Sequence, residues 1–219
     1  MPNQIRAGAV LTYLTLFLNS VIGLIYTPFL TRMLGQGEYG LYSLVASVVG
    51  SLTILDFGFG NALIRYTARL RAERAEQKLK QMYGMFFVIF CGIALLSLIV
   101  GLILYFNIDT LFSRNMNAEE LSKVRVMFLL LIFNLAFTFI MSVYRSIIVA
   151  YERFVFQKVI NLIRIILNPL VMVVLLLFGY KAVSMVVVQT IFNVLTLCAD
   201  YYYCKRKLNV SFVFGKFDF

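Results

Sequence analysis

The chain has 219 residues, of which 62% are hydrophobic and only 14% charged, and its mean hydropathy is +0.89. Soluble domains are typically about 45–50% apolar and about 25% charged, so this composition excludes an ordinary soluble enzyme and a disordered chain. The formal charge is +10, and the sequence contains no histidine and three cysteines without the spacing of a zinc site. The composition therefore predicts a membrane protein without a metal site.

Charged residues divide the chain into segments long enough to cross a bilayer. A hydrocarbon core of about 30 Å needs about 20 helical residues. The second and fifth segments contain one charge each, Asp56 and Arg164. The predicted fold class is an all-α integral membrane protein, a six-transmembrane-helix bundle over residues 1–208. Its helices are expected at about residues 8–32, 39–64, 82–106, 126–150, 159–179 and 182–204.

The lysine and arginine residues of the loops predict the orientation. Most lie in residues 1–7, 65–81, 151–158 and the tail after residue 204, which all fall on one side of the membrane. The positive-inside rule makes that side, with both termini, cytoplasmic. The basic charge is thus explained by topology, and no nucleic-acid partner is expected.

Four of the predicted helices carry polar residues along one face, at spacings of three, four, seven or eleven. Such side chains turn toward other helices or a wet cavity, because hydrocarbon leaves them without hydrogen bonds. A single polar residue is more often a contact between helices, but four polar faces favour a shared lumen. The faces are Thr12, Thr15 and Asn19; Asn134, Thr138, Ser142 and Arg145; Asn161, Arg164 and Asn168; and Gln189, Asn193, Thr196 and Asp200.

The second predicted helix has small residues on one face and glycines near its end. Ser43, Ser47 and Ser51 recur every four residues, a pattern that lets another helix approach closely. Gly58 and Gly60 follow Asp56 and predict a kink or a locally opened helix. The alternative interpretation is that the two glycines only allow another helix to pack closely.

Three charges inside the predicted helices are candidates for function. Asp56 lies about 13 Å from the cytoplasmic end at helical rise, too deep for its short side chain to reach the surface. Arg145 and Arg164 are expected at similar depth on the cytoplasmic side, at the mouth of the lumen. Two guanidinium groups there suit an anion, because their planar fork matches phosphate oxygens. Alternatively, the long side chain of each arginine extends to the membrane surface and places its charge in the interface.

Several short motifs in this order resemble one family. They are Thr31-Arg32-Met33-Leu34-Gly35, Glu38-Tyr39-Gly40-Leu41-Tyr42, the stretch from Asp56 to Tyr66, the stretch from Tyr144 to Arg153, and the helix with Arg164, Asn168 and Pro169. Together with the six predicted membrane spans, these motifs resemble those of the polysaccharide-biosynthesis flippases, which export lipid-linked oligosaccharides of the O-antigen type. These flippases belong to the multidrug/oligosaccharidyl-lipid/polysaccharide superfamily.

The resemblance implies a place in the bacterial inner membrane and a substrate of undecaprenyl-diphosphate-linked sugar units. It also implies two six-helix lobes around a central cavity, of which this chain supplies the amino-terminal lobe of a MATE-like transporter. Residues 209–219 are then expected to be a cytoplasmic tail or a linker to a missing second lobe. Either the chain is a fragment or two copies associate, and we favour the hypothesis that it is a fragment.

The leading hypothesis is transport of this lipid by alternating access, without catalysis or a cofactor. The expected substrate-binding residues are Arg145, Arg164 and Arg65 for the diphosphate, and Asn134, Asn161, Asn168 and Asn193 for the sugar. Asp56 and Asp200 are expected to form ion pairs or to carry a coupling proton or Na⁺, and Gly58 and Gly60 to form a hinge. One alternative is efflux of an organic cation or drug. Another is a membrane enzyme or an assembly partner in polysaccharide synthesis.

Overall fold

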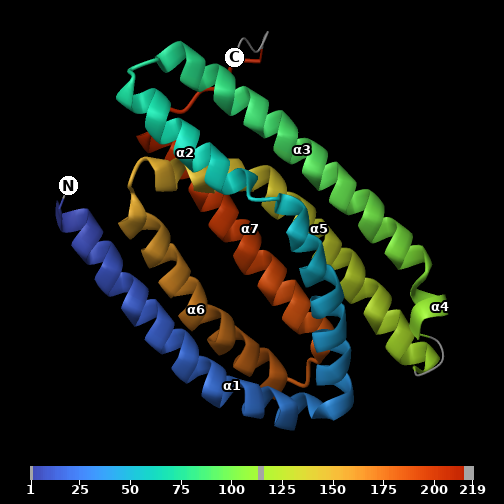
Figure 1. Ribbon diagram of the computed structural model, residues 1–219. Helices are drawn as coiled ribbons and strands as arrows, with labels where there is room; N and C mark the ends of the chain where they lie inside the picture. The colour runs from blue at the N-terminus through green and yellow to red at the C-terminus, as the bar shows by residue number, and fades with distance from the viewer. Residues whose placement is uncertain (1, 113–115, 215–219) are drawn as a thin grey trace.

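The computed structural model describes residues 2–112 and 116–214, and within them the chain is an all-α bundle without strands (Figure 1). Five helical stretches are long and apolar enough to cross a membrane, the first running from Val10 to Ala72. This confirms the predicted all-α membrane bundle. The elements are α1 (Pro2–Ser51), the 3₁₀ helix η1 (Leu52–Asp56), α2 (Phe59–Ala72), α3 (Glu76–Phe106), α4 (Ile108–Phe112), α5 (Ala118–Ala150), α6 (Phe154–Leu177) and α7 (Ala182–Lys207).

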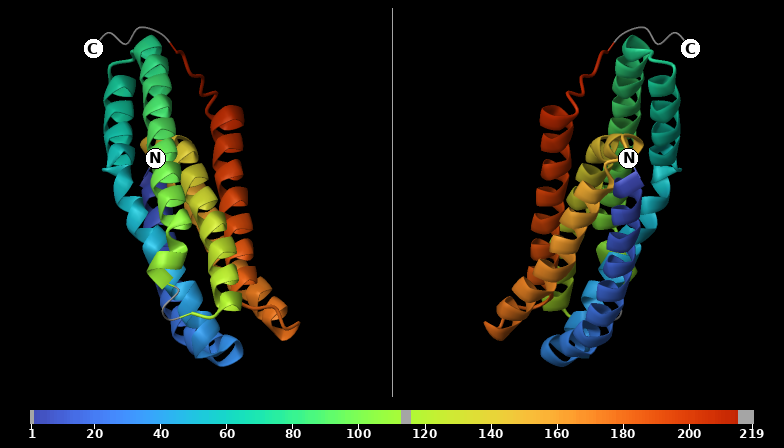
Figure 2. Two further views of the ribbon diagram at one scale, coloured as in Figure 1. Left: turned by 90° about the vertical axis from the view of Figure 1, so that its right-hand side faces the viewer. Right: turned by 90° about the vertical axis from the view of Figure 1, so that its left-hand side faces the viewer.

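The bundle has two ends that differ in charge. We call the end that holds the turn between α2 and α3 and the last turn of α7 the basic end, because Lys205, Arg206 and Lys207 lie there. We call the opposite end, where α1 bends, the Gly35 end. The long helices run between these two ends (Figure 2). α1 and α6 both leave the basic end in the same direction, whereas α7 returns to it (Figure 1).

The first two predicted spans are joined by a bend at one residue. Gly35 has φ 78° and ψ 163°, and the helix continues on both sides of it. Only glycine adopts this conformation readily, because a Cβ atom would clash with the backbone. α1 therefore has a first leg, residues 2–34, and a second leg, residues 36–51, which diverge from the bend in Figure 1. This bend stands in place of the separate connection that the sequence predicts between residues 32 and 39.

The predicted helix over residues 39–64 is interrupted before its end. After η1, Phe57 and Gly58 adopt left-handed conformations with φ 46° and 76°, and α2 then begins at Phe59. Gly58 tolerates this conformation because it lacks a side chain. Asp56 thus lies just before the break, and Gly60 lies in the first turn of α2. The chain is opened where the glycines predict it, and their role as a hinge stays a prediction.

The small-residue face of the second leg is not covered by another helix in the described chain. Ser43, Ser47 and Ser51 are exposed. The hydroxyl groups of Ser47 and Ser51 donate to backbone carbonyls of their own helix. A Cβ atom added at Gly50 would meet nothing within 4 Å.

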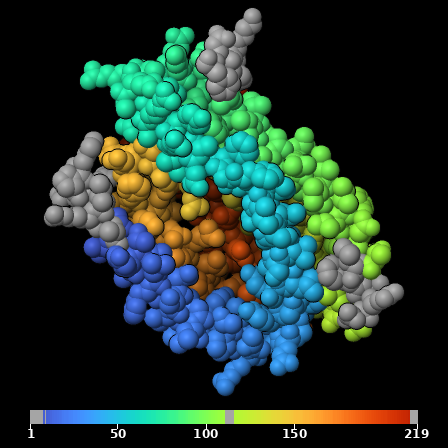
Figure 3. Space-filling view, viewed as in Figure 1, coloured from blue at the N-terminus to red at the C-terminus, as the bar shows by residue number. Residues whose placement is uncertain are grey.

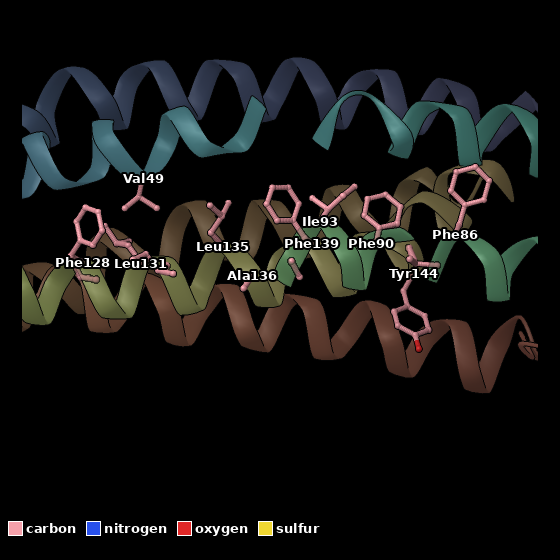
Figure 4. Close-up of a cluster of buried hydrophobic side chains, with 14 of the residues drawn as sticks. Val49, Phe86, Phe90, Ile93, Phe128, Leu131, Leu135, Ala136, Phe139 and Tyr144 are labelled. Atoms are coloured by element: carbon pink, nitrogen blue, oxygen red, sulfur yellow. The ribbon is translucent and has the colours of Figure 1, made fainter. Parts of the chain in front are cut away.

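The main core lies around α5, which packs against α1, α2, α3 and α7. Phe90 of α3 and Phe128, Ile132 and Ile147 of α5 are almost completely buried. Figure 4 shows Phe86, Phe90 and Phe128 within this layer of apolar side chains. Gly101 of α3 lies against Ile132, since a Cβ atom there would come within 2.8 Å of the isoleucine side chain. In lipid, helices associate through such close packing, because the lipid chains are as apolar as the side chains and burial alone favours no particular helix contact.

A second layer is formed by α6 and the first leg of α1. The two helices meet closely at the basic end, where a Cβ atom added at Gly8 would lie 3.3 Å from Phe154. At the Gly35 end they enclose a smaller apolar cluster together with α7, which includes Leu30, Met172 and Met185. Between the contact at the basic end and the apolar cluster at the Gly35 end, a hollow remains among α1, α6 and α7.

The tail after α7 turns back onto α3 at the basic end (Figure 2). The backbone N–H of Val213 donates to the carbonyl of Lys80 at 3.2 Å. The ring of Phe212 lies 6.2 Å from that of Tyr83, 5.6 Å from that of Phe87 and 5.5 Å from that of Tyr144. Residues 209–214 are therefore packed against the bundle. The rest of the expected tail, residues 215–219, lies outside the described residues.

Candidate functional site

A cavity of about 600 Å³ lies between the two legs of α1, the part of α6 from Lys158 to Met172 and the first turns of α7. Figure 3 shows the face into which it opens, with α1 at the rim and α6 and α7 at the bottom of the hollow. The volume falls in the range of about 300–1,000 Å³ that is typical of ligand-binding clefts.

Two of the polar faces predicted from the sequence meet across this cavity. α1 contributes Thr12, Thr15 and Asn19, and α6 contributes Asn161, Arg164 and Asn168, and all six residues line it. They face each other because α1 and α6 run side by side in the same direction (Figure 1). Three of the expected substrate-binding residues, Asn161, Arg164 and Asn168, are thereby brought together.

The cavity is positively charged at its basic end. Lys158 and Arg164, both from α6, are among its lining residues, and no carboxylate is found among the described residues that line it. Both cations are half-buried, so water screens them less than it screens a surface charge. This arrangement favours an anionic group over a cationic one.

Arg164 also contacts a polar network behind the cavity wall. Its Nη1 donates to Oδ1 of Asn193 on α7 at 3.4 Å. The side-chain amide of Asn193 donates in turn to Oδ1 of Asn134 and, at 2.8 Å, to Oγ1 of Thr138, both on α5. Asn134 completes the network with a 3.4 Å hydrogen bond to Thr190. The polar faces of α5, α6 and α7 therefore do meet, but Asn134 and Asn193 lie behind Arg164 and do not line the cavity.

The other expected arginines lie outside the cavity lining. Arg145 is exposed on α5, and its backbone carbonyl accepts a hydrogen bond from Gln157 at 2.8 Å. Arg65 is exposed on α2. The structure thus places one of the three expected arginines, Arg164, in the cavity.

The two acids expected to pair or to carry a coupling ion lie elsewhere in the bundle. Asp200 is 2% exposed in α7, and Asp56 is half-buried before the break. Neither belongs to an ion pair within the described residues. Asp56 lies near Gly60 and Ser146, because a Cβ atom at Gly60 would be 4.0 Å from Oδ2 of Asp56 and 3.3 Å from Oγ of Ser146. Neither acid lines the cavity.

Three polar lining residues belong neither to the expected site residues nor to the predicted polar faces: Lys158, Tyr26 and Tyr42. The predicted loop over residues 151–158 includes Lys158, although this residue precedes Asn161 by three residues and so shares its helical face. Tyr26 follows Asn19 by seven residues, again on one face. Spacings of three and seven residues place side chains on one face of a helix, so the sequence contains a signal for both residues. For Tyr42 no such signal exists, because it reaches the cavity only through the bend at Gly35.

A model of the family described as "Polysaccharide biosynthesis protein" matches residues 5–218. No curated protein and no solved structure matches the chain.

Proposed function

The chain belongs to the polysaccharide biosynthesis protein family, and from that premise we propose that it helps to move a lipid-linked oligosaccharide across the bacterial cytoplasmic membrane. The observation that carries this proposal is the charge of the cavity. Its described lining holds Lys158, Arg164 and several neutral amides and hydroxyls, but no carboxylate. A sugar joined to a lipid through a diphosphate needs cations for the phosphates and neutral hydrogen-bonding groups for the sugar.

The basic end of the bundle is assigned to the cytoplasm, in accordance with the positive-inside rule. Lys158 and Arg164 then lie near the cytoplasmic mouth of the cavity. A diphosphate in the inner leaflet can reach them while its prenyl chain stays among the lipids. An undecaprenyl chain is the lipid expected from the family.

No covalent step is required of the protein, and we assign it no enzymatic activity and no cofactor. Alternating access requires one bundle to move against another. The proposed transport therefore involves a second bundle, either a further lobe or a second copy of this one. Gly58 and Gly60 are the proposed hinge, and Asp56 and Asp200 are the proposed carriers of a coupling proton or Na⁺.

Equilibrium binding to the purified chain in detergent tests the proposal. Farnesyl diphosphate serves as the anionic lipid and tetraphenylphosphonium as the lipophilic cation. We expect the diphosphate to bind and Lys158→Gln and Arg164→Gln each to weaken its binding about tenfold, the equivalent of about 1.4 kcal/mol. The control Lys78→Gln alters an exposed residue away from the cavity and leaves binding unchanged. Tighter binding of the cation, or unaltered diphosphate binding in both cavity variants, would overturn the proposal in favour of another cargo.

A further inference from the structure

The two ends of the cavity differ in chemistry. The basic end contains Lys158, Asn161 and Arg164 of α6 and Thr12 of α1. The end nearer Gly35 contains Tyr26, Tyr42, Met172, Met185 and Gln189. About 12 Å of helix separates Arg164 from Met172 at the usual rise, so one ligand could contact both ends.

The end nearer Gly35 holds its polar groups in fixed positions. The hydroxyl of Tyr42 donates to Oε1 of Gln189 at 3.0 Å. With its oxygen engaged, the amide of Gln189 presents its two N–H groups as donors, and the hydroxyl oxygen of Tyr42 can still accept. Tyr26 packs against the same apolar cluster as Tyr42, and both tyrosines line the cavity. The cavity wall here therefore combines two phenol groups with an oriented amide.

A backbone acceptor lies between the two ends. Pro169 is inside α6 and has no N–H, so the carbonyl of Ile165 lacks the donor that a helix normally supplies four residues later. Both residues line the cavity. A hydroxyl group of a ligand can satisfy this carbonyl without disturbing the helix.

The same end is closed by apolar packing. Met172 and Met185 belong to the cluster of α1, α6 and α7 at the Gly35 end, and they are 2% and 6% exposed. Tyr26, Tyr42 and Gln189 are half-buried above this cluster. Hydrogen bonds formed here are partly shielded from water, and an unpaired charge would be costly.

We propose that Tyr26, Tyr42 and Gln189, with the Ile165 carbonyl, form a saccharide subsite for the sugar next to the diphosphate. A pyranose ring presents C–H bonds on its faces and hydroxyl groups at its edge. The negative face of an aromatic ring attracts the C–H face, and the amide, phenol and carbonyl groups bind the hydroxyls. The sugar lies toward the Gly35 end and the diphosphate toward the basic end. This inference rests on the proposed function, because it places the sugar relative to the anion site.

Two lipids that differ only in a sugar test the inference: a short polyprenyl diphosphate and the same lipid bearing one N-acetylhexosamine. The wild-type chain in detergent is expected to bind the sugar-bearing lipid about tenfold more tightly. Tyr42→Leu and Gln189→Leu are expected to abolish that preference and to leave binding of the sugar-free lipid unchanged. Tyr42→Phe, which retains the ring but not the donor to Gln189, is expected to lose about half of the preference on a logarithmic scale.

Controls separate failure of this inference from failure of the proposed function. Tyr13→Leu alters an exposed tyrosine of α1 that does not line the cavity, and it should preserve the preference. Arg164→Gln should weaken the binding of both lipids equally.

Equal binding of the two lipids by the wild type, or equal weakening of the binding of both by Tyr42→Leu, overturns the proposed subsite alone. Stronger effects on the sugar-free lipid would mean that this end holds the prenyl chain, which also overturns it. Failure of both lipids to bind would overturn the proposed function itself.

Discussion

The guanidinium of Arg164 donates to the side-chain oxygen of Asn193 at 3.4 Å, across the contact between α6 and α7. Asn193 can present this oxygen because its amide nitrogen is engaged by Asn134 and Thr138 of α5. The cavity cation is thus oriented by residues that do not line the cavity. Asn193 is in this sense a positioning residue for the proposed anion site.

Replacement of Asn193 should weaken anion binding without removing a cation. Asn193→Leu is expected to lower the affinity for farnesyl diphosphate about fivefold, since a lost hydrogen bond of this kind contributes about 1 kcal/mol. Asn193→Asp should lower it further, because a carboxylate beside Arg164 competes with the phosphates. The exposed Asn107 at the end of α3 supplies the matched control, Asn107→Leu. If the Asp and Leu variants bind equally well, Asn193 acts only in packing.

The tail should detach from α3 when Gly84 acquires a side chain. A Cβ atom at Gly84 would lie 2.5 Å from the carbonyl oxygen of Val213, a distance that forces the backbone to move. Gly84→Ala is expected to cost about 1–3 kcal/mol of stability and to expose residues 209–214 to protease. Limited proteolysis and thermal unfolding in detergent measure both effects.

Gly92, in the same helix, provides the control for this experiment. A Cβ atom there meets nothing within 4 Å. Gly92→Ala should therefore be neutral or stabilising, by up to about 1 kcal/mol, because alanine favours helix. A tail that is equally resistant to protease in both variants would contradict the observed contact.

The bend of α1 should depend on glycine at position 35. Gly35→Ala forces an alanine to φ 78° and ψ 163°, and we expect a loss of about 1–3 kcal/mol or a straightened α1. Gly37→Ala, two residues later, meets nothing within 4 Å and should not destabilise the protein. Thermal unfolding midpoints in detergent compare the two variants. Similar midpoints for both would show that the bend tolerates a side chain.

A pH-dependent contribution to stability is expected at the Gly35 end. Nζ of Lys123 lies 2.8 Å from the carboxylate of Glu119 and 2.6 Å from that of Glu38, which joins α5 to α1. The hydrogen bond from Lys123 lowers the pKa of Glu119 below its ordinary value of 4.5. A carboxyl group with a lowered pKa stabilises the fold above that ordinary value, and the contribution disappears as pH falls below it.

Lys123→Met should therefore lower the unfolding midpoint at about pH 7 more than at about pH 3. The hydrogen bonds to the two carboxylates also raise the pKa of Lys123, so its own contribution persists through neutral pH and is lost only in strong alkali. The exposed Lys78 offers the control Lys78→Met, with no pH-dependent difference expected. A wild-type advantage that is constant between about pH 3 and 7 would contradict the prediction.

Periodicity in the sequence was sufficient to identify much of the candidate site. The faces that carry Asn19 and Arg164 were recognised from spacing alone, and both line the cavity. Lys158 and Tyr26 lie on the same two faces, three residues before Asn161 and seven after Asn19, so helical spacing also predicts their place in the cavity. The fold class was predictable for a similar reason, because charged residues are costly in hydrocarbon and therefore mark the ends of membrane helices.

Other features were not accessible from spacing. Arg145 and Arg164 were expected at one cavity mouth, but Arg145 is exposed outside the lining and Arg164 lies within it. Asn193 shares a helical face with Gln189, yet Gln189 lines the cavity and Asn193 contacts Arg164 behind it. A helical face is about 100° wide, so two residues on it can contact different neighbours when the helices cross at an angle.

The amino-acid sequence by itself determined that the chain is a helical membrane protein, where its apolar segments lie and which polar residues share a helical face. Tertiary structure alone decided that α1 bends at one glycine, that α6 lies along its first leg and that Arg164 is held between the cavity and Asn193. The physical reason is that burial in lipid selects apolar segments without choosing their neighbours. Close contacts such as that of Gly101 with Ile132 set the rotation and spacing of each helix, and these depend on the whole bundle.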